Sequence, residues 1–330
     1  MTGTRFAAIN VDLESCFIMR NKIVPMLLVL GIVSGARGAS VVLLASGSAS
    51  AGLRTSDLAE TQAKWATMET AVRKKVAAFR GEVGLVIRDL GTGWTIQIDP
   101  DKVFPSASMV KVPIMAACLE AQREGRLSLD DRMTLKRSDK TTGSGLLRRN
   151  RSGSVFTVDR LVELMVAHSD NTATNMLIDR LGFDYLNGAF REMGLETTNL
   201  TRKMMDFGSR GRGLENYTTA REMADILERM YRRDCFCPEV SGMCLEYLKS
   251  QKVNDRIPRF LPKNVVVAHK TGLERQVCHD AGIVFTERGD FLISVFTRTT
   301  RGSRTAKSLI SGVSALAYKV YGPEPAKTRT

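Results

Sequence analysis

The order in which the hydrophobic period changes along the chain constrains the fold more than any other feature. Near both ends, short apolar and β-branched segments of the kind that form strands are separated by turn residues. Between them lies a long stretch in which apolar residues recur at helical spacing. Strands are predicted at residues 83–88, 94–98, 265–268, 281–285 and 291–296. Because both ends share the strand period, we expect them to build one sheet.

The predicted helices complete this arrangement. They lie at residues 55–80, 108–122, 158–167, 172–181, 185–193 and 305–321, and from Thr218 or Thr219 to about residue 232, with residues 202–216 irregular. The predicted fold class is mixed α/β, of the α+β type: an antiparallel sheet with flanking helices built from both chain ends, plus an all-helical inserted domain. We expect the sheet domain at residues 52–104 and 251–330, and the helical domain at 105–250.

The first 51 residues have the pattern of an export signal. Arg20 and Lys22 precede an apolar run at residues 23–33, and small residues at 48–51 offer a cleavage site. The run is short for a membrane span and Arg37 follows it, so a cleaved signal peptide is favoured over a retained N-terminal anchor. We therefore expect a segment that engages the export machinery, and a mature protein in the periplasm or outside the cell.

The formal net charge of +13 predicts attraction to polyanions, among them nucleic acid, anionic lipid and acidic cell-wall polymers such as peptidoglycan. Nucleic acid is disfavoured because the lysines and arginines are scattered and only 6% of the residues are aromatic.

The cysteines do not have the spacing of a metal site. Cys235, Cys237 and Cys244 are close in sequence, but no CxxC pair and no well-spaced histidine accompanies them. We expect no metal and no cofactor. In an exported protein some of the six cysteines could pair as disulfides, and the sequence leaves the pairing open.

The first motif with chemical meaning is Ser108-Met109-Val110-Lys111. Residues three apart face the same way on a helix, so the Ser108 hydroxyl and the Lys111 amine are expected on one side. A serine hydroxyl is a weak nucleophile unless a nearby base takes its proton. A lysine serves as that base only if burial or a neighbouring cation lowers its pKa. The alternative is a surface helix with an exposed lysine, and the apolar residues around the motif count against it.

The second motif is Ser169-Asp170-Asn171, in a turn between two apolar helices. Serine, aspartate and asparagine are favoured N-cap residues, so a purely structural role is the alternative, and we assign it to Asp170. Ser169 could relay a proton to a leaving group, and Asn171 could hold a substrate amide.

The third motif is Lys270-Thr271-Gly272, at the end of the strand predicted at residues 265–268. Glycine there lets a substrate backbone approach the strand edge, and Lys270 and Thr271 would bind a carboxylate. Arg256, fourteen residues earlier, is a further candidate for that carboxylate, with a solvated arginine as the alternative.

Each motif alone is weak evidence for a function. Together, in this order along one chain, the motifs resemble those of the class A β-lactamases and of the penicillin-binding proteins that share their fold. The resemblance extends over residues 82–320. It includes Phe104-Pro105, Thr218-Thr219-Ala220, Leu261-Pro262 and Asp280-Ala281-Gly282-Ile283-Val284.

This resemblance implies a serine hydrolase that opens β-lactam amides, or D-alanyl peptides, through an acyl-enzyme on Ser108. Lys111 would help remove the Ser108 proton, and Ser169 would protonate the leaving nitrogen with help from Lys270. The backbone N–H groups of Ser108 and Leu273 would form the oxyanion hole. Lys270, Thr271 and Arg256 would hold the substrate carboxylate, and Gly272 would let the substrate backbone approach the strand.

One departure from the family pattern leaves three hypotheses open. The class A enzymes carry a glutamate about 34 residues after the motif asparagine, where it activates the deacylating water. This chain has no glutamate there, and Asp206, then Glu215, are the nearest carboxylates. The leading hypothesis is a β-lactamase. The absent glutamate motivates the first alternative, a D-alanyl-D-alanine carboxypeptidase or transpeptidase of the penicillin-binding type with slow deacylation. The basic charge suggests the second, an inactive cell-wall binding protein.

Overall fold

The sheet joins the two ends of the folded chain, as predicted. The computed structural model describes residues 55–322, so the expected signal segment at 1–51 lies outside the described residues. Five strands run in the order β2-β1-β9-β8-β7, and each neighbouring pair is antiparallel. Their bounds are β1 Glu82–Asp89, β2 Thr95–Ile98, β7 Val266–Glu274, β8 Val277–Phe285 and β9 Phe291–Arg298.

The strand β7 is longer than the sequence predicted, and this changes the place of the third motif. Pairing with β8 continues through Lys270↔Ala281 and Gly272↔His279 to Glu274↔Val277. Lys270-Thr271-Gly272 therefore lies within β7 and not after its end, which corrects the prediction. A strand that is buried on both faces loses the apolar–polar alternation by which its length would be read.

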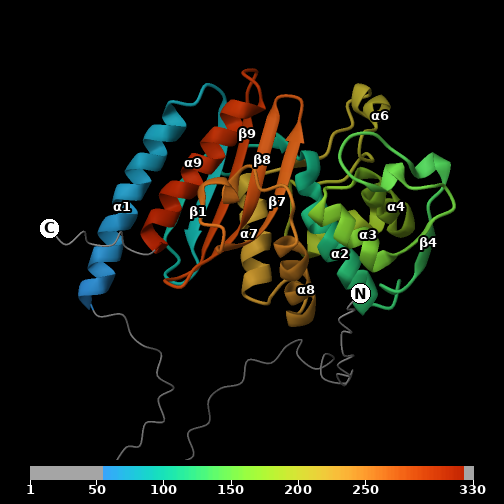
Figure 1. Ribbon diagram of the computed structural model, residues 1–330, viewed down its shortest axis with the longest axis horizontal. Coiled ribbons are helices and arrows are strands. Elements are labelled where there is room, and N and C mark those ends of the chain that lie inside the picture. The colour runs from blue at the N-terminus through green and yellow to red at the C-terminus, as the bar shows by residue number, and fades with distance from the viewer. Residues whose placement is uncertain (1–54, 323–330) are drawn as a thin grey trace, which may run out of the picture. The chain divides into compact units, whose positions relative to one another are not determined.

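Each face of the sheet has its own core. The helices α1 (Thr55–Ala77) and α9 (Ser303–Tyr321) lie side by side along one face (Figure 1), where Leu85 and Ile293 point into an apolar cluster with Ile310. Neighbouring residues such as Val86 and Leu292 face the other cluster, because successive side chains of a strand alternate.

The helical block covers the second face. It consists of η1 (Ala107–Val110), α2 (Lys111–Arg123), α3 (Val158–Ala167), α4 (Asn171–Leu181), α5 (Phe183–Glu192), α6 (Phe207–Gly211), α7 (Ala220–Tyr231) and α8 (Pro238–Lys249). The short pairs β3 (Phe104–Pro105) with β6 (Tyr217–Thr218), and β4 (Arg132–Thr134) with β5 (Val155–Thr157), connect these elements, as do the 3-10 turns η2 (Arg137–Asp139), η3 (Leu147–Arg149) and η4 (Ile257–Phe260). Because α7 packs directly on β9 and β1, one continuous apolar cluster joins the helical block to the sheet.

Three details differ from the predicted helices. The helix predicted from residue 108 begins as the 3-10 turn η1 and becomes α-helical at Lys111. The segment predicted as irregular contains α6, and α8 was not predicted.

The cysteines of the described part are buried free thiols, four of them in the helical core and Cys278 in the other cluster. Within residues 55–322 no group of three or more metal-ligating side chains is gathered, and no helix is both long and apolar enough to cross a membrane.

Candidate active site

Ser108 is held in a tight turn where the helical block meets the sheet. It is half-buried in η1, after Ala107, whose φ of +46° turns the chain sharply. The turn is fixed by a hydrogen bond from Ser106 N to Asn216 O (2.7 Å) and by His279, whose Nε2 lies 2.9 Å from Pro105 O. At this point β7 passes so close that a Cβ on Gly272 would lie 3.0 Å from Met109 Cγ. Gly272 therefore lets β7 approach the turn that carries Ser108, a packing role that the sequence did not reveal.

Lys111 extends into the protein from the first turn of α2 and is fully buried. Its Nζ donates to Ser169 O (2.6 Å), to Asn171 Oδ1 (2.8 Å) and to Ser169 Oγ (3.2 Å). Within residues 55–322 the Ser108 hydroxyl makes no hydrogen bond. The amine of Lys111 is bound instead to the second motif.

Lys270 reaches the same hydroxyl from the sheet. Its Nζ, also fully buried, donates to Ser169 Oγ (3.0 Å) and to Thr271 O (2.8 Å). The side chains of three distant chain segments thus meet at Ser169 Oγ. The structure brings Lys111, Ser169 and Lys270 into direct contact.

Burial and a neighbouring cation weaken each of the two amines as a proton binder. Burial lowers the pKa of Lys111 well below its ordinary value, the charge of Lys270 lowers it further, and Asp170 opposes the change. Burial, and then the nearby Arg256 guanidinium, lower the pKa of Lys270 to about 7, against the opposing Asp280. A lysine whose neutral form is populated near neutral pH can accept a proton. Both conditions set by the sequence for a lysine base, burial and a neighbouring cation, are present at Lys111.

Asp170 holds the turn that carries Ser169 and Asn171. Its Oδ1 accepts from Ala173 N (2.9 Å) as the N-cap of α4, and its Oδ2 accepts from Leu146 N (2.6 Å) and Leu147 N (2.7 Å). These bonds fix Ser169 in an unusual conformation with φ of +53°. The predicted structural role of Asp170 is confirmed.

A cavity of about 840 Å³, a size that suits a drug-sized ligand, is lined by Ser108 and by Asn171 of the second motif. Its wall includes Ser108, Asn171, Met204, Phe207 and Leu273. Ser108 and Leu273 therefore face one space, as an oxyanion hole requires, and their role as its donors stays a prediction. The side chain of Asn171 is engaged at both ends, by Lys111 and by its own Nδ2 donating to Thr142 O (3.1 Å).

A closed ring of four charges forms part of the same wall. Arg202 binds Glu215 (2.6 Å) and Glu274 (3.6 Å), and Arg210 binds Glu215 (3.0 Å) and Glu274. We call these four residues the ion ring. It joins both ends of the loop 202–215 to the end of β7. The sequence did not predict it, because its members become neighbours only through the tertiary fold.

Two predicted site residues lie elsewhere. Asp206 caps α6: its oxygens accept from Ser209 N (2.9 Å) and Ser209 Oγ (2.6 Å), and these bonds lower its pKa. Arg256 is buried on the face of β8 that α9 covers, where its Nε donates to Cys278 Sγ (3.2 Å). Neither residue is among those that line the cavity. Their roles in deacylation and in carboxylate binding stay predictions.

Known proteins are similar to this chain in sequence and in fold. The family described as "Beta-lactamase enzyme family" matches residues 67–321. A β-lactamase of Rhodobacter capsulatus is 32% identical over 212 residues, which cover 63% of this chain and 70% of the relative. The structure of a β-lactamase from Sphaerobacter thermophilus is 31% identical, with a TM-score of 0.71, covering 78% of this chain and 97% of that one. The structure of PBP-A is 30% identical, with a TM-score of 0.70, covering 77% and 95%. The chain therefore belongs to the beta-lactamase enzyme family.

Proposed function

We propose that this chain is a serine hydrolase of the β-lactamase type, in which Ser108 attacks the amide of a β-lactam and carries the resulting acyl group. The observation that supports this most strongly is the meeting of two buried amines, Lys111 Nζ and Lys270 Nζ, on Ser169 Oγ at 3.2 and 3.0 Å. Two ammonium groups in a buried site repel each other, so the site favours states in which one of the two amines is neutral. A neutral amine can accept a proton.

We infer an order of proton transfers in which the contacts of Ser169 Oγ with Lys111 and Lys270 support the second step. The neutral Lys111 amine takes the proton as Ser108 Oγ bonds to the carbonyl carbon. Lys111 then passes a proton to Ser169 Oγ, while the Ser169 hydroxyl gives its own proton to the amide nitrogen as the carbon–nitrogen bond breaks. Lys270, bound to the same oxygen, favours negative charge on it during the transfer.

The residues that line the cavity support deacylation less well than the buried amines support acylation. This difference favours a second candidate function. A water molecule needs a base to attack the acyl group. Glu274 is the one carboxylate among the lining residues, and like Glu215 it is shared between two guanidinium groups of the ion ring. The acyl-enzyme should therefore persist, which is the behaviour of a D-alanyl-D-alanine carboxypeptidase or transpeptidase of the penicillin-binding type. A mutant of PBP-A has been solved as an acyl-enzyme complex with penicillin G.

The lifetime of the adduct separates these functions. The protein is mixed with benzylpenicillin, and intact-protein mass spectra are taken from seconds to hours. An adduct that forms and disappears within seconds supports the β-lactamase, and one that lasts for hours supports the penicillin-binding enzyme. Ser108→Ala must remove the adduct, and Ser106→Ala, two residues away, must keep it. If the wild type neither shows an adduct nor consumes benzylpenicillin, the hydrolase proposal fails and the inactive cell-wall binding protein is left.

We further propose that the protein is exported and acts near peptidoglycan, in the periplasm or outside the cell, either free or held by an N-terminal anchor. The basic residues before the apolar run at 23–33, the small residues at 48–51 and the charge of +13 support this proposal. N-terminal sequencing of the protein from fractionated cells tests it. A mature start near residue 52 outside the cytoplasm is expected, an uncut chain in the membrane fraction indicates an anchor, and an uncut cytoplasmic chain contradicts export.

A further inference from the structure

The wall of the cavity carries one positive charge that the ion ring does not balance. The ring contains two arginines and two glutamates, so its formal charges cancel. Arg275 also lines the cavity, from the two-residue turn between β7 and β8. It is exposed, and no acidic side chain within residues 55–322 forms an ion pair with it. An anionic ligand would therefore find its counter-charge at Arg275.

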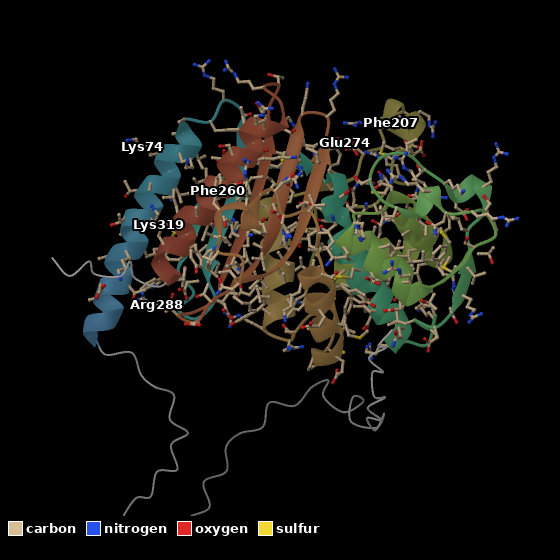
Figure 2. All side chains as sticks on the ribbon, viewed as in Figure 1. Lys74, Phe207, Phe260, Glu274, Arg288 and Lys319 are labelled. Carbon is tan, nitrogen blue, oxygen red and sulfur yellow. The ribbon has the colours of Figure 1, made fainter. Side chains whose placement is uncertain are left out.

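An exposed aromatic ring shares the mouth of this cavity. Phe207, the first residue of α6, lines the cavity with 54% of its surface exposed, beside Met204 and Met205. Figure 2 shows Phe207 on α6 and Glu274 at the end of β7, and both residues line the cavity. Phe207 fills no core, and it gives the cavity a flat apolar surface that a ligand can cover.

The ion ring fixes the spacing between these two groups. Arg210 lies three residues after Phe207 on α6, and Glu274 directly precedes Arg275. The ion pair of Arg210 with Glu274 thus ties the helix that carries Phe207 to the turn that carries Arg275. Two recognition groups of different chemistry are held at one opening.

We propose that Arg275 and Phe207 make this site select acyl groups that combine an aromatic ring with a negative charge. The inference rests on the proposed function, because it takes the acyl group of Ser108 to extend into this cavity. The guanidinium would bind a carboxylate through paired hydrogen bonds, and the phenyl ring of the acyl group would pack on Phe207.

Two penicillins that differ by one carboxylate test the proposal: benzylpenicillin and its α-carboxy derivative. The second-order rate constant for labelling Ser108 is measured for each, and their ratio isolates the added charge. Arg275→Gln should lower the ratio of the charged to the uncharged penicillin about two- to fivefold, the range for a solvent-exposed ion pair. Arg288→Gln is the matched control, because Arg288 is also exposed in a turn next to β8, but at the other end of this nine-residue strand, about 30 Å away. It should leave the ratio unchanged.

Phe207→Ala should slow labelling by both penicillins alike, because both carry the phenyl ring, and keep their ratio. Raising the salt concentration should lower the wild-type ratio toward that of Arg275→Gln. If benzylpenicillin labels Ser108 but Arg275→Gln leaves the ratio unchanged, the inference is overturned and the proposed function stands. If neither penicillin labels Ser108 and neither is hydrolysed, both are overturned.

Discussion

Removing the carboxylate of Asp170 should destabilise this protein more than removing any ordinary helix cap. Asp170 is 1% exposed and accepts three backbone N–H groups, from Leu146, Leu147 and Ala173, at 2.6 to 2.9 Å. A hydrogen bond to a charged group contributes about 1.5–3 kcal/mol, so three of them sum to about 4.5–9 kcal/mol. The bonds share one acceptor group and water can enter the space it leaves, so the sum overcounts. We expect Asp170→Ala to lower the free energy of unfolding by about 4 kcal/mol, near the upper end for single substitutions.

Urea unfolding at neutral pH measures this loss, with Thr157→Ala as the matched control. Thr157 caps α3 and accepts a single N–H, from Arg160 (3.2 Å), at a more exposed place. Its loss should cost about 1 kcal/mol. If Asp170→Ala unfolds completely, Asp170→Asn keeps an acceptor oxygen and should lose about half as much. A loss for Asp170→Ala no larger than that for Thr157→Ala would show that the carboxylate does not hold the 146–147 loop to α4, and would refute this reasoning.

Three further predictions follow from the buried charges and the cavity wall. The unfolded chain binds a proton at Lys270 between pH about 7 and about 10.5, where the folded chain does not, so the free energy of unfolding should rise with pH across this range. In urea titrations the free energy of unfolding of Lys270→Met should rise less steeply with pH than that of the wild type. Equal slopes would contradict the assignment of this proton to Lys270. Arg202→Met leaves the buried Glu215 with Arg210 as its ion-pair partner and should lower the free energy of unfolding by about 3–5 kcal/mol. Replacing Arg202 and Glu215 together by apolar residues should lower it clearly less. Met204→Glu places a carboxylate in the wall and should shorten the lifetime of the penicilloyl adduct at least about tenfold, a modest effect for an added general base. Met204→Gln should leave the lifetime unchanged, and an equal effect of both changes would exclude base catalysis.

The sequence predicted those parts of the fold that local chemistry determines. Thr219 caps α7 as expected, accepting from Glu222 N (3.1 Å), because an N-cap depends only on residues of its own turn. The helix α8 was not predicted because its apolar side includes Cys244, and a buried cysteine packs like any small apolar residue without contributing to a clear apolar pattern. The ion ring could not be predicted, since Glu274 meets Arg202 and Arg210 across more than sixty residues of sequence.

The two halves of the proposed reaction depend on different parts of the structure, and they should therefore respond independently to substitution. Lys111, Ser169 and Lys270 are all buried, and both lysines bond to Ser169 Oγ, so a change in any of the three disturbs the groups that form the acyl-enzyme. The loop that carries Met204 contributes to the cavity wall, but none of its side chains bonds to these three groups in the described structure. Lys111→Met should accordingly abolish labelling of Ser108, whereas Met204→Glu should change the lifetime of the adduct and leave the rate of its formation nearly constant. If Met204→Glu slows labelling as much as it shortens the lifetime, the wall and the buried lysines act as one unit, and the separation of the two steps is wrong.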